Sequence, residues 1–96
     1  MISKKVKSSN VYPINSGAMV EVSVETDGEA VSGNISLNKA YGSVRVLSVG
    51  ILNRNATAYT GAVSVQLVDN ATIAVAAPAV AGSKPLITIT LICEVS

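Results

Sequence analysis

Four carboxylates crowd one short stretch of the chain, and their types and spacing are the strongest sign of possible chemistry. They are Glu21, Glu25, Asp27 and Glu29. Two carboxylates held at the right separation in a groove can hydrolyse a glycosidic bond, and carboxylate oxygens can also bind calcium. The spacing matches no calcium loop, and the chain has no Trp or Phe to stack against a sugar. We therefore expect a solvated strand face whose charges protect a sheet edge.

The other reactive residue types are too few to build a catalytic or metal site. The chain has no histidine, which removes the commonest general base and the commonest metal ligand. Its single cysteine, Cys93, can form neither an intramolecular disulfide nor a zinc site by itself. Cys93 lies in phase with apolar residues of a strand pattern, so we expect a small buried hydrophobic residue. The sequence predicts no enzyme activity, no cofactor and no metal.

Composition limits the partners that the chain can have. Its 96 residues suffice for one domain, and 49% of them are hydrophobic while only 14% are charged. So little charge makes a small chain prone to associate. The net charge is +1 and the basic residues are scattered, so no nucleic-acid surface is expected. No apolar run reaches membrane-helix length, and residues 1–10 lack the core of a secretory signal, so we expect a protein made in a cytoplasm without membrane insertion.

The acidic residues lie in a segment with the pattern of two short strands. Valines alternate with polar residues over 20–24, which is the period of a half-buried strand. The pair Asp27-Gly28 suits a two-residue type I′ turn. Such a turn places Val24 opposite Val31 and gathers the large aliphatic residues on one face. The pattern predicts a β-hairpin over 20–37.

The segment 43–52 is a predicted strand with an unusual distribution of apolar residues. Val44 and Val46 lie on one face, and Leu47, Val49 and Ile51 lie on the other. A strand that is apolar on both faces is typical of one buried on both sides. In so short a chain, we expect the second cover to come from another subunit.

Two further patterns predict strands in the C-terminal half. An odd-length connection after the segment 58–68 would pair Leu67 with Ile73 and Val65 with Val75, so we expect three or five residues there. The segment 86–95 is long and rich in β-branched residues. At an exposed edge it would be prone to aggregate, so we expect it in the middle of a sheet or between subunits.

Together these patterns predict an all-β protein. About six strands, separated by turns every 8–12 residues or so, indicate an antiparallel β-sandwich, jelly-roll-like, of about six to eight strands over residues 18–96. Residues 1–17 are polar and contain a Tyr12-Pro13 step without periodicity. They are expected to form an N-terminal arm, either a disordered terminus or a tether that docks on a partner.

The residue types in the strands and loops of the chain resemble those of a known class of proteins. The segments "SGNISLNKAYGSVRVLSVGIL" and "ITITLICEVS" combine Val/Ile/Thr strands with loops of small residues and little charge. They resemble small virion proteins of tailed bacteriophages, of the head-fibre, decoration or receptor-binding tip type. The resemblance covers the chain from about Val20 onwards and carries over no functional residue. It implies a trimeric sandwich in the virion, attached through its N-terminal segment to a capsid or other virion protein.

Two other classes stay open. A bacterial surface, pilus-like or spore-coat module would normally need an export signal. A lectin-like module would bind carbohydrate or another receptor, such as a host-surface glycan, with Tyr41 and Tyr59 as modest platforms. The favoured interpretation is a non-enzymatic homotrimer. Its predicted interface consists of Leu47, Val49, Ile51, Leu86 and Ile92.

Overall fold

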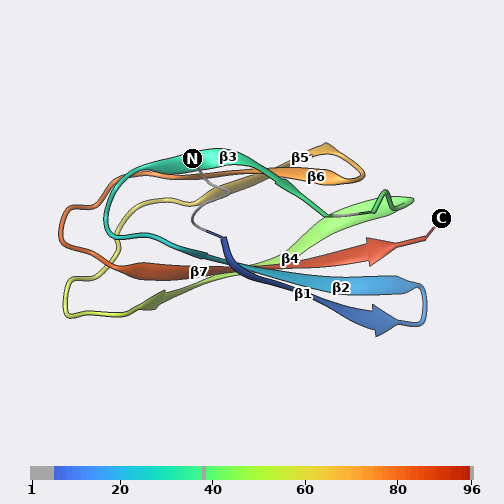
Figure 1. The fold of residues 1–96 in the computed structure, drawn as a ribbon, viewed down its shortest axis with the longest axis horizontal. Coiled ribbons are helices and arrows are strands. Elements are labelled where there is room, and N and C mark those ends of the chain that lie inside the picture. The colour runs from blue at the N-terminus through green and yellow to red at the C-terminus, as the bar shows by residue number, and fades with distance from the viewer. Residues whose placement is uncertain (1–5, 38, 96) are drawn as a thin grey trace.

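The computed structural model describes residues 6–37 and 39–95, and these residues form strands and no helix. The strands are β1 (Val6–Ile14), β2 (Gly17–Glu25), β3 (Val31–Ser36), β4 (Ser43–Asn53), β5 (Ser64–Asp69), β6 (Thr72–Ala77) and β7 (Pro85–Glu94). They make two antiparallel sheets, in the orders β1-β2-β7-β4 and β3-β6-β5, stacked as two layers (Figure 1). The predicted antiparallel β-sandwich is confirmed.

The chain winds repeatedly between the two layers. Only the connections β1–β2 and β5–β6 stay within one sheet, and the other connections of the described chain cross from one sheet to the other. This winding places β7 between β2 and β4, where both of its edges are hydrogen-bonded. The long C-terminal strand is therefore central in its sheet, as expected.

The core lies between the layers and follows the period-two pattern of the strands. Every second residue of β2 and β7 points inward and is buried, because successive side chains of a strand point to opposite faces. The fully buried aliphatic residues are Val20, Val22, Val24, Ile73, Ile87, Ile89 and Leu91. Without Trp or Phe, the chain fills this space with compact β-branched residues, which suit a pleated surface.

The predicted hairpin over 20–37 is wrong. Strand β2 pairs with β1 and β7, whereas β3 pairs with β6 in the other sheet. The segment around Asp27-Gly28 crosses between the layers instead of turning within one. The aliphatic residues of both segments are still buried in one core, because they meet across the sandwich instead of side by side. The alternation is the same in either arrangement, so the pattern alone could not separate them.

The expected N-terminal arm also needs correction. Residues 6–14 of the predicted 1–17 segment form β1, which pairs along its length with β2; residues 1–5 lie outside the described residues. A strand at a sheet edge tolerates polar residues such as Ser8 and Asn10, which are exposed here. The sandwich therefore includes residues 6–14 and does not begin at residue 18.

A β-bulge changes the expected faces of β4. The register with β7 shifts between Val46 and Ser48, so Leu47 is an extra residue on the β4 side. One extra residue reverses the phase of the alternation. Val49 and Ile51 therefore share the inner face with Val46, and they do not lie on the opposite face as the unbroken pattern predicts.

The β5–β6 hairpin has the predicted register. Leu67 lies opposite Ile73, and Val65 lies opposite Val75. The chain reaches this register by a different route from the expected odd-length loop. A two-residue turn pairs Asp69 with Thr72, and a shift between Leu67 and Asp69 supplies the missing residue.

Candidate self-association surface

The exposed apolar side chains gather on one flank of the sandwich. Strands β4 and β5 are the last strands of their sheets, and they contact each other across the two layers. Among the residues that the structure describes, eleven large hydrophobic side chains are exposed, and seven of them belong to these two strands. The seven are Val46, Leu47, Val49, Ile51, Leu52, Leu67 and Val68. We call this set the open flank.

Inner-facing residues of the open flank continue the core but are not covered. Opposed residues of an antiparallel pair point to the same face, so Val46, Val49 and Ile51 share the inner face with Leu91, Ile89 and Ile87 of β7. The β7 residues are 0% exposed, whereas Val46 and Val49 are 38% exposed and Ile51 is 40% exposed. The same holds for β5, where Leu67 is 45% exposed beside a fully buried residue of β6. The core is open along this flank.

The uncovered surface is large enough to matter energetically. Burying a Val, Leu or Ile side chain completely contributes about 1.5–3 kcal/mol. Four inner-facing side chains of the open flank are each exposed over about two-fifths of their surface, and they are Val46, Val49, Ile51 and Leu67. Covering all four would contribute roughly 2–5 kcal/mol per chain.

The structure separates the five predicted interface residues. Leu47 occupies the bulge and is exposed, and Val49 and Ile51 lie on the inner face of β4. Leu86 and Ile92 are half-buried on the outer face of the four-stranded sheet, because they alternate with the buried residues of β7. These two are not part of the open flank.

Some residues of the open flank were missed by the sequence pattern. Leu52 lies opposite Leu86 and is exposed, and Leu67 and Val68 come from the facing sheet. The apolar run that ends at Leu52 was a visible signal. Nothing in the sequence showed that β5 would reach the same flank, since that depends on how the chain crosses between the layers.

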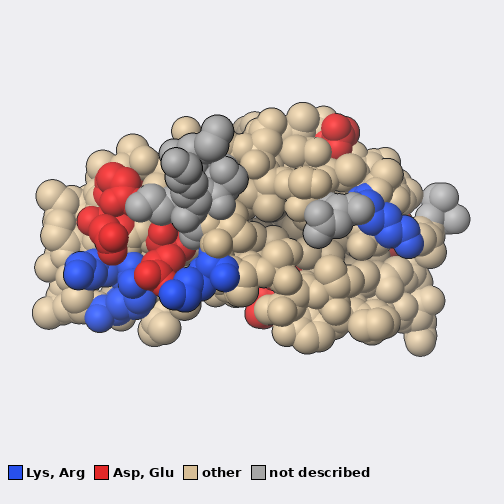
Figure 2. All heavy atoms as spheres, viewed as in Figure 1, with Lys and Arg blue, Asp and Glu red and all other residues tan. Residues whose placement is uncertain are grey.

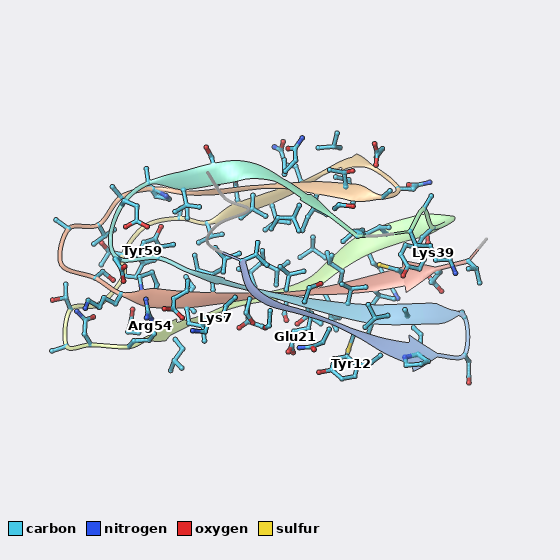
Figure 3. All side chains as sticks on the ribbon, viewed as in Figure 1. Lys7, Tyr12, Glu21, Lys39, Arg54 and Tyr59 are labelled. Atoms are coloured by element: carbon cyan, nitrogen blue, oxygen red, sulfur yellow. The ribbon has the colours of Figure 1, made fainter. Side chains whose placement is uncertain are left out.

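Two of the four carboxylates expected to form a solvated face take part in a charged cluster at one end of the molecule. In Figure 2 the charged side chains gather mainly at this end, and most of the remaining visible face is uncharged. Arg54 donates to Oε1 of Glu25 at 2.7 Å and lies 3.4 Å from Oδ1 of Asp27. Lys7 lies 3.4 Å from Oε2 of Glu25 (Figure 3). The carboxylates of Glu25 and Asp27 therefore have structural partners, whereas Glu21 lies apart along β2.

Arg54 also binds main-chain atoms from two other connections. Its Nη2 donates to the carbonyl oxygen of Thr26 at 2.6 Å, and its Nε donates to that of Lys84 at 3.1 Å. These bonds join the ends of β2, β4 and β7 at the point where the chain crosses between sheets. Among the described residues, no three His, Cys, Asp or Glu side chains lie close enough together to hold a metal ion.

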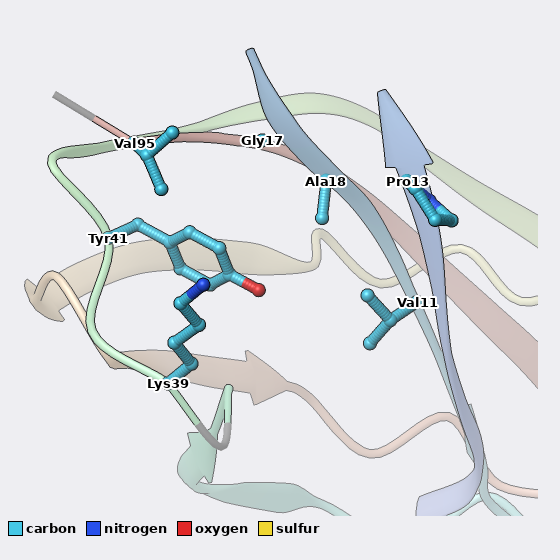
Figure 4. A pocket seen from close by; sticks show the side chains of 7 residues that line it. All are labelled: Val11, Pro13, Gly17, Ala18, Lys39, Tyr41 and Val95. Atoms are coloured by element: carbon cyan, nitrogen blue, oxygen red, sulfur yellow. The ribbon is translucent and has the colours of Figure 1, made fainter. Parts of the chain in front are cut away.

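Two hollows are lined by residues that do not belong to the open flank. One has a volume of about 420 Å³ and is lined by apolar residues of β1 and β2 and by Lys39 and Tyr41 (Figure 4). The Lys39 ammonium lies 5.6 Å from the centre of the Tyr41 ring, a cation–π arrangement. The other is a groove of about 220 Å³ on the outer face of the three-stranded sheet.

The suggested tyrosine platforms are not available on the surface. Tyr41 and Tyr59 are both buried and belong to the core. The hydroxyl of Tyr59 donates to the carbonyl oxygen of Pro78 at 2.7 Å, and burial raises the pKa of Tyr59. Tyr12 is the exposed tyrosine, on the outer face of β1 beside Met19 (Figure 3). Neither ring offers an open platform on the outer surface, because Tyr59 is buried and Tyr41 contributes only to the wall of the first hollow, beside Lys39.

Cys93 is part of the core, as expected, and its thiol should be unreactive in the folded chain. The residue is 0% exposed, and burial raises the pKa of the thiol, which disfavours the reactive thiolate at neutral pH. We expect iodoacetamide to leave the native chain unmodified and to add one group in urea, measured by intact mass. Rapid alkylation of the folded chain would contradict the position of Cys93 in the core.

Comparison with known proteins finds no relative from which a function could be transferred. No protein-family model matches the chain, and no match was found among curated proteins or solved structures. In the part of the chain that the structure describes, no helix is long and apolar enough to cross a membrane.

Proposed function

We propose that this chain is a non-enzymatic structural protein of a virus particle, of the bacteriophage decoration, head-fibre or tail-tip type, and that it works as a homo-oligomer. The observation that carries self-association is the open flank, where inner-facing residues of β4 and β5 extend the core to the surface. Patches of exposed apolar residues on small domains commonly mark sites of protein association. Assignment to the virion is supported by the resemblance of the sequence, and the capsid or another virion protein is the proposed partner.

Replacing Val49 with aspartate should dissociate the oligomer. The side chain faces inward at the open flank, so a second subunit would bury the new carboxylate without a partner, which is strongly unfavourable. We expect light scattering to give an oligomeric mass for the wild-type chain and the mass of one chain for Val49→Asp. Three chains would support the trimer that the resemblance implies.

The matched control is Ser32→Asp. It adds the same charge to an exposed residue of β3, on the outer face of the other sheet opposite Ala76. The control should keep the oligomeric mass. A folded Val49→Asp chain with unchanged mass would exclude Val49 from the interface, and a monomeric wild-type chain would overturn self-association.

Membership of a virus particle needs a separate experiment. Peptides of this chain should be present in purified particles from the culture that produces it, in a constant ratio to the major capsid protein. The free chain should also bind particles that lack it. Absence from purified particles would overturn assignment to the virion and leave the self-association result unaffected.

One observation favours the second candidate, a carbohydrate- or receptor-binding module. The groove on the three-stranded sheet has an alanine floor in β6 and walls from β3 and β5. Asn34 and Gln66 flank Ala74 in one row, and Ser32 and Ser64 flank Ala76 in the next. Neutral amides and hydroxyls can both donate to and accept from sugar hydroxyls. Binding on a glycan array that is lost in Asn34→Ala would support this function.

A further inference from the structure

The main chain of β4 presents a regular free edge. Arg54 N–H donates to the carbonyl oxygen of Lys84 at 3.0 Å, so at this residue β4 points its main-chain groups toward β7. In an antiparallel pair the direction alternates along the strand. The N–H and C=O groups of Leu52 and Gly50 must therefore also point toward β7. Those of Val49, Ile51 and Asn53 point away from it, to the free edge.

Other sheet edges carry features that discourage pairing. Val95 N–H donates to Ser16 O at 2.8 Å, and this fixes the alternation of β2 and, through the β1–β2 hairpin, that of β1. With this alternation, the main-chain groups of Pro13 point to the free edge of β1. Proline has no N–H to donate to an added strand, so it discourages pairing at this edge. Strand β3 contains Gly33 with a φ of 149°, and β5 has a bulge and ends at the charged Asp69.

The free edge of β4 lacks these features after its bulge. The segment 48–53 contains no proline and no charged residue, and it pairs with β7 without a further shift in register. Uncharged edges that carry apolar side chains and no proline are rare in proteins that remain monomeric, because they template pairing with another strand. This contrast distinguishes β4 from the other edges of the two sheets.

We propose that β4 pairs antiparallel with β4 of a second copy about a two-fold axis at Gly50. This inference rests on the proposed self-association and specifies its geometry. In this register Val49 of one copy lies opposite Ile51 of the other, and both point their main-chain groups to the shared edge. The two four-stranded sheets become one sheet, and the inner apolar rows of the open flanks meet.

The character of Gly50 fits its place on the axis. A Cβ built at this position meets no atom within 4 Å, so the packing of a single chain gives no reason for a glycine. In the proposed register Gly50 faces its own copy as a pair that is not hydrogen-bonded, and such pairs approach to about 4.5 Å between Cα atoms. A residue without a side chain suits this close approach.

The direct test is Ile51→Pro. Proline removes the N–H that points to the free edge and leaves the hydrogen bonds between β4 and β7 intact. We expect an even number of chains in the wild-type assembly and the mass of one chain for Ile51→Pro. Ile51→Val is the matched control, because it keeps the N–H and the branched side chain, and it should keep the wild-type mass.

A second variant tests the register without weakening the strand. Two cysteines at Gly50 positions related by the axis would lie within the Cα separation that a disulfide allows. Gly50→Cys should therefore give a nearly complete covalent dimer under mild oxidation. Ser64→Cys, on the outer face of the other sheet, should not, and the buried Cys93 does not interfere.

The outcomes separate this contact from the proposed function. A trimeric wild-type chain whose Gly50→Cys variant does not cross-link would overturn the two-fold contact and leave self-association standing. A monomeric wild-type chain would overturn both. An even-numbered assembly that loses its mass in Ile51→Pro and cross-links in Gly50→Cys would support the contact.

Discussion

Replacing Leu91 with alanine is expected to lower the free energy of unfolding by about 2–5 kcal/mol. Leu91 is fully buried in the middle of β7, opposite Val20 of β2 and Val46 of β4. Both neighbouring strands are hydrogen-bonded to β7, so the backbone cannot easily collapse into the space that the side chain leaves. The loss should combine the lost burial with the cost of the remaining cavity. Urea unfolding, followed by circular dichroism, measures it.

The control for Leu91→Ala is Thr90→Ala, one residue away on the same strand. Thr90 points to the outer face, between Glu21 and Ser48, and its removal leaves no cavity in the core. The expected loss is below about 1 kcal/mol, within the range of strand propensities. Equal losses for the two variants would show that β7 does not present alternate residues to one core.

The strands that could be predicted from the sequence are those whose pattern allows one burial solution. In β7 apolar residues alternate with threonines from Ile87 to Leu91, and the length of the strand favours a central position. In the β5–β6 hairpin, only one parity of the register puts Leu67 beside Ile73 and Val65 beside Val75. In both segments the arrangement that buries the apolar residues is also the one in which the strands pair, so the local sequence pattern was sufficient to predict it.

The segments that could not be predicted have more than one solution with equal burial. The valines of β2 and the aliphatic residues of β3 enter the same core whether they pair in one sheet or face each other across two. The choice depends on contacts distant in sequence, such as the bonds from Arg54 to Glu25 and Thr26. Strand β1 was missed because an edge strand needs few apolar residues. It is held in place by pairing with β2, and its own sequence pattern does not show that pairing.

The candidate surface was predictable in its location along the chain and not in its composition. The excess of apolar residues over 43–52 correctly indicated a strand that one chain does not cover. The bulge at Leu47 is defined by the register with β7, which the sequence does not show, and it moves Val49 and Ile51 to the inner face. Leu86 and Ile92 fell outside the open flank for the same reason, since a face can be assigned only when both strands and their register are known.

Replacing Gly17 with alanine is expected to lower the free energy of unfolding by about 2–4 kcal/mol. Gly17 begins β2 and lies between Ile14 of β1 and Glu94 of β7. Its φ of 157° is one that residues with a side chain rarely adopt. A Cβ at this position would also collide with the carbonyl oxygen of Cys93, a main-chain atom of the central strand. The strands must therefore separate locally to admit a methyl group.

Gly50→Ala is the matched control for Gly17→Ala, because it makes the same chemical change in a strand of the same sheet. A Cβ at Gly50 has open space around it, and alanine favours strand conformation at least as well as glycine. We expect its stability to stay within about 0.5 kcal/mol of the wild-type value when both are measured at the same low chain concentration. If Gly17→Ala were equally harmless, β2 could not approach β7 as closely as the structure places it. A large loss of stability in Gly17→Ala alone would show that the cost comes from the close contact between Gly17 and the main chain of β7. It would not come from replacing a strand glycine as such, because Gly50→Ala makes the same replacement.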